Sequence, residues 1–199
     1  PDGHLVLNAD DPLLVRYGPT RFDRIDWFGF DPGHPEIRAA PAAAWVDQDI
    51  LWLRVGGRTT QLGAIADMPL SVQGIARYNV ANLMGAALVA RRLGVSEEVI
   101  RNVLHRFGRK HGDNPGRLQR YRIRGIDVLT DYAHNPDGLA NLLDVGRRLN
   151  AEGRLALVLG QAGNRDNAEI LALADVALRF RPDYIVLKDL QGYMRGRAF

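Results

Sequence analysis

The chain has 199 residues, of which 46% are hydrophobic and 25% charged, a composition that is typical of a globular protein with one sizeable core or two small ones. It contains no cysteine, which excludes disulfides, thiolate metal sites and cysteine nucleophiles and favours a cytoplasmic location. The net charge of +3 is carried mainly by scattered arginines, which does not indicate a nucleic-acid partner, and no apolar run approaches the ~20 residues that cross a membrane.

The first part of the chain carries strand patterns. The segment LVLNADDP, residues 5–12, is a short apolar run that ends in acids and proline, which predicts a buried strand whose carboxyl end faces a site. Residues 21–70 then carry β-branched and aromatic residues in the stretches RIDWFGF, AAWVDQDILWLRV and TTQLGAI. Gly56 and Gly57, between the last two stretches, predict a hairpin turn. We therefore expect this part of the chain to be rich in β-structure.

From Ile75 onward the apolar residues follow a helical period. Gly94 ends the first predicted helix, and Ser96 caps a second one. The apolar stripe of the first helix consists of Val80, Leu83, Met84, Ala87 and Leu88, and that of the second of Val99, Ile100, Val103, Leu104 and Phe107.

The segment GRKHGDNPG, residues 108–116, is rich in glycine, charge and proline, which predicts a domain boundary between residues 1–112 and 113–199. The pattern beyond it is strand, helix, strand, helix, strand, over residues 126–130, 136–150, 155–160, 167–180 and 184–187. Such alternation predicts βαβ units and a mostly parallel sheet. The expected fold class is α/β: a Rossmann-like βαβ domain, preceded by an α/β part with a β-rich segment and two helices.

Polar residues follow two successive strands of the second half, where ligands bind in parallel sheets. We expect the two strand ends to lie side by side and to form one polar patch. By spacing alone, an alternative remains open, in which Asp131 and Asn135 cap the helix that begins near Pro136 and His134 is a surface residue. The polar residues are Asp131, Tyr132, His134 and Asn135 after the first strand, and Asn164, Arg165 and Asp166 after the second.

The motif DYAHNP, residues 131–136, resembles the C-terminal-domain motif of the Mur ligase superfamily, whose members are ATP-dependent amide-bond-forming enzymes. Other segments resemble family motifs in the family's order: NADDP at 8–12, YNVANLMGAALVARRLG at 78–94, NPGRLQ at 114–119 and GQAGNRD at 160–166. Within the superfamily, DYAHNPDGL and the segment IVLKDLQGYMRGR at 185–197 are most similar to the ligase half of cyanophycin synthetases.

The resemblance implies that residues 1–112 form the C-terminal part of a central ATP-binding domain and residues 113–199 a Mur ligase C-terminal domain. In this family the phosphate-binding loop precedes NADDP, and no GxxxxGK[ST] occurs in this chain. We therefore expect the chain to be part of a longer ligase, to bind ATP with Mg²⁺ ligands mostly outside the chain, and not to catalyse alone.

The resemblance also implies individual roles in nucleotide binding. Asn79 and Asn82 match asparagines that contact the adenine, since an amide offers both a donor and an acceptor. Arg117 matches a hinge arginine that reaches the phosphate or ribose, and Asp131 an acid that accepts hydrogen bonds from the ribose hydroxyls. Because these residues lie in both halves, ATP is expected to contact both. For Asn79, capping of the helix start is the alternative.

For catalysis, the resemblance implies that His134, Asn135, Arg165 and Asp166 surround an acyl phosphate and the incoming amine. The partners would then be ATP, a carboxylate acceptor, an amino acid or amine, and the rest of the ligase chain, with a homo-oligomer left open. The alternative from another class is a non-catalytic nucleotide-binding or regulatory module derived from this family. A dehydrogenase lacks support, because no GxGxxG follows a predicted strand.

Overall fold

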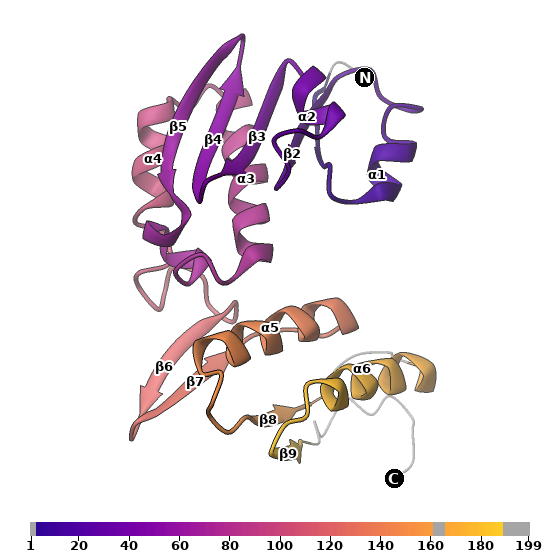
Figure 1. Cartoon of the computed structure of the whole chain (residues 1–199), viewed down its shortest axis with the longest axis vertical. Helices are drawn as coiled ribbons and strands as arrows, with labels where there is room; N and C mark the ends of the chain where they lie inside the picture. Colours follow the sequence, from indigo (N-terminus) through magenta and orange to yellow (C-terminus); the bar gives the residue numbers. More distant parts are fainter. Residues whose placement is uncertain (1–2, 161–165, 189–199) are drawn as a thin grey trace. The chain divides into compact units, whose positions relative to one another are not determined.

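The computed structural model describes residues 3–160 and 166–188 (Figure 1). The chain forms two compact units, Pro1–Asp113 and Asn114–Phe199. Their boundary falls inside the glycine-rich segment 108–116, where the sequence predicted one.

The first unit is built on a five-stranded sheet in the order β1-β2-β3-β4-β5. Strands β1, β2 and β3 run parallel, and β4 and β5 are added antiparallel. The predicted turn at Gly56 and Gly57 is confirmed, with φ of 59° and 80°. A second turn, at Gln48 and Asp49, divides the stretch AAWVDQDILWLRV into two strands. The strands are β1 (Leu5–Asn8), β2 (Ile25–Gly29), β3 (Ala42–Asp47), β4 (Ile50–Val55) and β5 (Arg58–Ala64).

Helices cover both faces of this sheet (Figure 1). Successive residues of β3 point to opposite faces, so Ala42 and Ala44 join the core with α3 and α4, whereas Ala43 joins the smaller core with α2. The result is a three-layer α/β/α unit. Its helices are α1 (Pro12–Tyr17), α2 (Pro35–Ala39), the 3₁₀ turns Ile65–Asp67 and Pro69–Ser71, α3 (Arg77–Arg92) and α4 (Glu97–Leu104).

The predicted apolar stripe is buried completely in α3 but only partly in α4. All five predicted apolar residues of α3 are buried, and Ser96 caps α4 through the Val99 N–H. In α4, however, only Ile100 and Leu104 are buried, while Val99 is 50% exposed. Only a narrow side of this short helix faces the sheet, so its two buried residues are four positions apart.

The second unit combines a hairpin with a βαβ segment. Strands β8 (Ala156–Leu159) and β9 (Tyr184–Leu187) pair in parallel, as the pattern predicted. Strand β7 (Ile126–Thr130) pairs antiparallel with β6 (Gln119–Ile123). The sequence pattern did not predict β6. Helices α5 (Pro136–Leu149) and α6 (Asn167–Arg179) pack together over a core that includes Leu139, Leu143, Leu157, Leu173 and Val176. The α/β class is confirmed.

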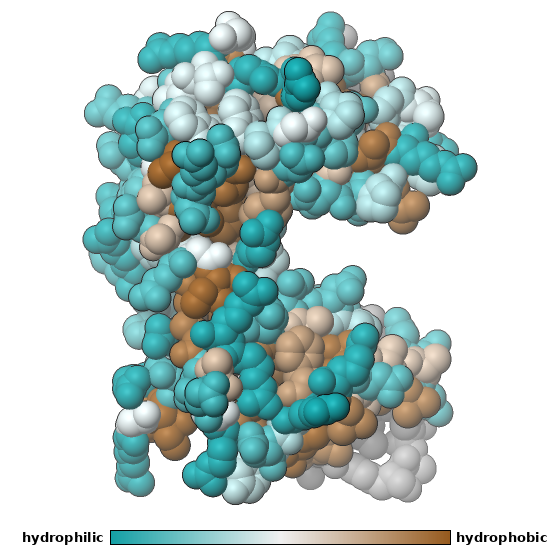
Figure 2. Space-filling model, in the orientation of Figure 1, coloured by the Kyte–Doolittle hydropathy of each residue, from teal (hydrophilic) through white to brown (hydrophobic). Residues whose placement is uncertain are grey.

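Apolar side chains also remain on the surface of this unit, where Figure 2 shows brown areas among the teal ones. Val158 of β8 and all four residues of β9 are exposed, Leu187 to 78%. Among the described residues, no helix is long and apolar enough to cross a membrane.

The β6–β7 hairpin is predicted to lose stability in acid. Arg120 and Arg122 donate to the Asp127 carboxylate at 3.1 and 3.0 Å. The hydrogen bond from Arg120 is the main cause that lowers the pKa of Asp127 below its ordinary 3.8. A lowered folded-state pKa means that the stabilisation is complete above the unfolded value and is lost as the pH falls through the folded value. Amide exchange of the hairpin should therefore accelerate relative to β8 below about pH 4, and Asp127→Asn should remove this difference.

Candidate functional site

The segment after β7 is bonded to the turn that precedes β6. The Asp131 carboxylate accepts the Leu118 N–H through Oδ2 at 2.7 Å and the Ala133 N–H through Oδ1 at 2.8 Å. The next backbone N–H, that of Tyr132, donates to the Gly116 carbonyl at 2.9 Å. The bonds from Leu118 and to Gly116 join the end of β7 to residues 116–118, and the bond from Ala133 is local. Asp131 does not cap helix α5, whose N-cap is Asn135.

Three side chains form an exposed surface beside these bonds, which we call the Arg117–Tyr132–His134 stack. The Arg117 guanidinium lies over the Tyr132 ring, 5.4 Å from its centroid, and the Tyr132 and His134 ring centroids are 5.2 Å apart. Tyr132 and His134 share a face because they are two residues apart in extended backbone. Tyr132 is 60% exposed. Planar rings beside a guanidinium can contact a flat ligand, and the guanidinium can pair with phosphate.

Two predicted catalytic residues are helix caps. Asn135 accepts the Gly138 N–H at 2.7 Å and begins α5, with Pro136 at the first helical position. Asp166 and Glu169 form a capping box at the start of α6, in which each side chain accepts the other's backbone N–H. Asn135 therefore caps α5, as the alternative expected. Its catalytic role stays a prediction, since a helix N-terminus is also a place where anions bind.

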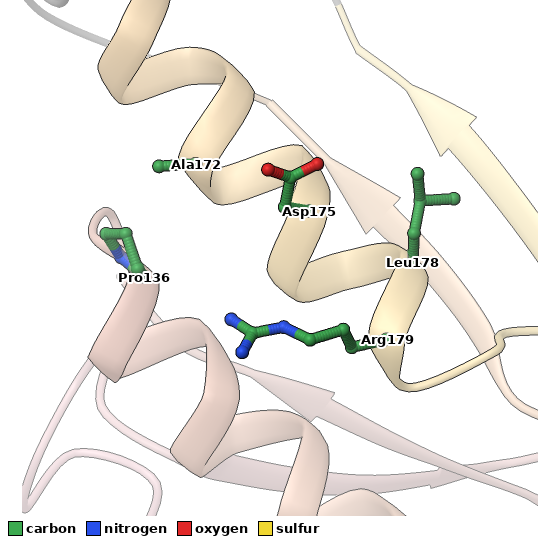
Figure 3. Close-up of a pocket in the computed structure, with 5 residues that line it drawn as sticks. All are labelled: Pro136, Ala172, Asp175, Leu178 and Arg179. Atoms are coloured by element: carbon green, nitrogen blue, oxygen red, sulfur yellow. The ribbon is translucent and has the colours of Figure 1, made fainter.

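Arg165 and Asn164 lie outside the described residues, so the expected convergence of Arg165 with Asp131 stays a prediction. An open pocket of about 720 Å³ lies between α6 and the start of α5 (Figure 3). The Arg179 side chain extends from α6 toward α5, and the Asp175 carboxylate points away from it. The lining residues are Pro136, Ala172, Asp175, Leu178 and Arg179, none of which was predicted as a site residue.

The two predicted adenine contacts lie in the first unit, on α3. Asn79 is only 7% exposed, and its Nδ2 donates to the Leu70 carbonyl at 2.9 Å. Asn82 donates to Asn79 Oδ1 at 3.5 Å and is itself exposed. Ala76 occupies the N-cap of α3, so Asn79 does not cap this helix. Asn82 is thus the more accessible amide, and Asn79 links it to the Leu70 carbonyl of the 3₁₀ turn Pro69–Ser71.

The NADDP motif after β1 organises the carboxyl end of the first sheet. Asp10 accepts the Phe30 N–H at 3.1 Å, and Asp11 caps α1 through the Leu13 N–H. The Arg77 guanidinium lies 3.8 Å from the centroid of the Phe30 ring. Sequence reasoning missed this pair and the role of Tyr132, although aromatic residues beside strand ends were the available signal. Within residues 3–160 and 166–188, no cluster of three or more His, Asp or Glu side chains could hold a metal ion.

Taken together, these features define a class: an α/β protein with a Rossmann-like unit whose polar segment follows a strand, as in ligand-binding α/β proteins. Residues 116–192 match the family model described as Mur ligase, glutamate ligase domain. This match lies within the second unit, and cyanophycin synthetases and Mur ligases are similar to the chain along nearly its whole length.

Two relatives and one solved structure illustrate this homology. The cyanophycin synthetase of Crocosphaera subtropica is 29% identical over 99% of the chain. The UDP-N-acetylmuramoyl-L-alanyl-D-glutamate–2,6-diaminopimelate ligase of Geobacter metallireducens is 33% identical over 92% of it. The crystal structure of a murein peptide ligase from Psychrobacter arcticus shares the fold, with a TM-score of 0.66 at 18% identity over 97% of the chain. The chain spans 23%, 34% and 39% of these three proteins, respectively.

The N-cap of α5 provides a test of how much the Asn135 side chain stabilises this helix. Asn135→Ala should lower the free energy of unfolding of the second unit by about 1 kcal/mol, because the Gly138 N–H loses its acceptor. Asn135→Ser keeps an oxygen at this position and should lose only a few tenths of that. Chemical denaturation of both variants measures the difference. Equal losses would show that the side-chain oxygen does not stabilise the helix.

Proposed function

We propose that this chain is the part of an ATP-dependent amide ligase that binds the nucleotide and the amine. The observation that carries the proposal is the Arg117–Tyr132–His134 stack, an exposed surface fixed to the end of β7 inside the segment that matches the Mur ligase family. The reaction class is the transfer of the ATP γ-phosphoryl to a carboxylate, followed by attack of an amine on the acyl phosphate. Such chemistry depends on positioning and on cations near the developing charge.

Each proposed role uses a property of the described residues. Asn82 offers an accessible amide for the adenine edge, with Asn79 behind it. Arg117 would pair with a phosphate or ribose oxygen. Asp131, whose carboxylate accepts the N–H of the neighbouring Leu118, would accept hydrogen bonds from the ribose hydroxyls. The further members of the proposed site are His134, beside Tyr132, the helix-capping oxygens of Asn135 and Asp166, and Arg165, which lies outside the described residues.

The described residues fit the nucleotide better than the metal. A guanidinium over an aromatic ring and an exposed amide suit an anionic ligand with a flat base. No described acidic cluster suits Mg²⁺, and we propose that its ligands belong to the remainder of a longer ligase. The carboxylate acceptor and the added amino acid would be bound with that remainder.

A second candidate is a nucleotide-binding or regulatory module without catalysis. One observation favours it: Asn135 and Asp166 serve as helix caps. Both candidates predict adenine-nucleotide binding. Only the ligase predicts product formation by the complete protein.

The test therefore uses the 199-residue chain and the complete protein that contains it. The chain alone should bind ATP only weakly, in the roughly millimolar range that ~4 kcal/mol supports, and should not hydrolyse it. The complete protein should release phosphate from ATP only when a carboxylate acceptor and an amino acid are both present. Phosphate release that is independent of the amino acid, or none with any pair, would refute the ligase proposal and leave the second candidate.

A further inference from the structure

We propose that Ser71 is a positioning residue for the nucleotide base: its hydroxyl fixes the Leu70–Ser71 peptide group, which sets the orientation of the Asn79 amide. This inference rests on the proposed function for its ligand, whereas the hydrogen bonds that carry it lie within the first unit. Ser71 is fully buried, so it acts on a nucleotide only through other residues. Its effect passes through Asn79 and leaves the proposed direct contacts of Asn79 and Asn82 in place.

The Ser71 hydroxyl both donates and accepts a hydrogen bond. Its Oγ donates to the Ile65 carbonyl at 2.5 Å and accepts the Gly74 N–H at 2.8 Å. The backbone of Ser71 makes two more bonds: its N–H donates to the Met68 carbonyl at 2.9 Å, and its carbonyl accepts the Ala76 N–H at 2.7 Å. Two of these four bonds therefore depend on the side chain.

The turn that follows Ser71 needs such support, because three successive residues are in the left-handed region. Val72, Gln73 and Gly74 have φ of 51°, 59° and 83°. Only glycine adopts this conformation at little cost, and a β-branched valine rarely does. Such a backbone persists only where its surroundings hold it, and the bond from the Gly74 N–H to the Ser71 hydroxyl closes this turn. Ala76, the N-cap of α3, has no capping side chain, so loss of the hydroxyl loosens the start of this helix.

The Leu70 carbonyl and the Ser71 N–H belong to one planar peptide group, so fixing Ser71 also fixes the direction of that carbonyl. Asn79 Nδ2 donates to the Leu70 carbonyl at 2.9 Å. Only the NH₂ end of an amide can donate to a carbonyl oxygen, so Oδ1 of Asn79 is left to accept from Asn82 Nδ2 at 3.5 Å. Asn79 keeps a second hydrogen and a second lone pair, and Asn82 is exposed, so both amides can still contact a base.

The orientation of an amide distinguishes adenine from guanine. Adenine presents an NH₂ donor at position 6 beside the N7 acceptor, whereas guanine presents an oxygen acceptor at position 6. An amide whose oxygen is fixed toward position 6 accepts from adenine but faces another acceptor in guanine. An amide that turns freely can place its NH₂ group against the guanine oxygen instead. Ser71 therefore affects base specificity as well as affinity.

The first experiment needs no nucleotide and uses the 199-residue chain. Ser71→Ala should accelerate the exchange of the Gly74 amide and of the Asn79 side-chain NH₂ group about tenfold, the factor that corresponds to the loss of one hydrogen bond. Thr60→Val is the matched control, because it also removes a hydroxyl donor from the first unit, the one that Thr60 donates to Glu97 at 2.7 Å. It should leave both exchange rates unchanged. Unchanged rates in Ser71→Ala would overturn the inference.

The second experiment compares ATP and GTP as substrates of the complete protein. Wild type should prefer ATP, and Ser71→Ala should reduce the ratio of the two kcat/KM values about tenfold, mainly through a higher KM for ATP. Thr60→Val should keep the wild-type ratio. A merely structural role of Ser71 would lower the use of both nucleotides by the same factor, and an unchanged ratio would therefore overturn the inference.

A double variant tests whether the effect passes through Asn79. Ser71→Ala combined with Asn79→Ala should lose no more discrimination than Asn79→Ala alone, and additive losses would refute the inference. If Ser71→Ala does not fold, Ser71→Cys, which keeps a weaker donor and acceptor, should show smaller changes in exchange and in the nucleotide ratio, and no change in either would overturn the inference. A complete protein that uses neither nucleotide, combined with the expected exchange result in the chain, would refute the proposed function and support the positioning of Asn79 by Ser71.

Discussion

Replacing Arg92 with alanine is expected to lower the free energy of unfolding of the first unit by about 3–5 kcal/mol. Arg92 lies in the last turn of α3, and its Nε and Nη2 donate to the two oxygens of Asp26 at 2.5 and 2.6 Å. Asp26 belongs to β2 and is fully buried. The hydrogen bond to Asp26 is the main cause that raises the pKa of Arg92. Without the guanidinium, a carboxylate would remain in the core without its principal partner.

Two variants make this prediction specific. Arg92→Met combined with Asp26→Asn replaces both charges, so it should recover much of the loss. Arg58→Ala is the control, because its side chain is 78% exposed and 3.9 Å from Glu97, and such pairs contribute about 0–1 kcal/mol. Urea unfolding measures all of these variants. A loss below about 1 kcal/mol for Arg92→Ala would mean that His4, 3.8 Å from Asp26, or water compensates the carboxylate.

Much of the fold follows from local patterns. The α3 stripe predicted the buried face because residues three and four apart lie on the same side of a helix. Helices α5 and α6 begin at a proline after an asparagine and at an aspartate with a glutamate three residues later, both of which are local start signals. The alternation of these helices with strands then predicted the parallel pair β8 and β9.

Other features depend on partners that are distant in sequence. Gln48 and Asp49 form a turn with φ of 47° and 59° although neither is glycine, so no local signal separated β3 from β4. Asp26 interrupts an apolar strand and is explained only by Arg92, which lies 66 residues later. Strand β6 carries three polar residues and depends on its pairing with β7.

The candidate site also combines a feature that has a local sequence signal with contacts that depend on distant residues. The sequence predicted the position of Asp131, Tyr132 and His134 directly after β7, because their polar run ends an apolar strand pattern. The bonds from Asp131 to Leu118 and from Tyr132 to Gly116 were not predictable, since they depend on how a turn thirteen or more residues earlier folds back. A motif can therefore indicate where a candidate site lies, whereas the backbone contacts of its side chains depend on the folded turn.

Replacing Gly63 with alanine is expected to destabilise the first unit by about 3 kcal/mol, because backbone strain and steric overlap add. Gly63 follows a bulge between β4 and β5, where Leu51 pairs with Gly63 and Trp52 with Gln61, so that Leu62 is the extra residue. Its φ is +122°, a conformation that L side chains rarely adopt. An added Cβ would also overlap the His105 ring and lie 2.7 Å from its Cε1.

The overlap and the strain can be separated with a second glycine. Gly57 has a φ of +80° with no atom within 4 Å of an added Cβ, so Gly57→Ala should show strain alone, about 1 kcal/mol. In Gly63→Ala, adding His105→Ala should recover the overlap but not the strain. His105 Nε2 lies 3.0 Å from the Leu62 carbonyl and joins the end of α4 to the bulge. If Gly63→Ala and Gly57→Ala lose equal stability, the imidazole moves aside freely, and its contact with Leu62 does not hold α4 to the sheet.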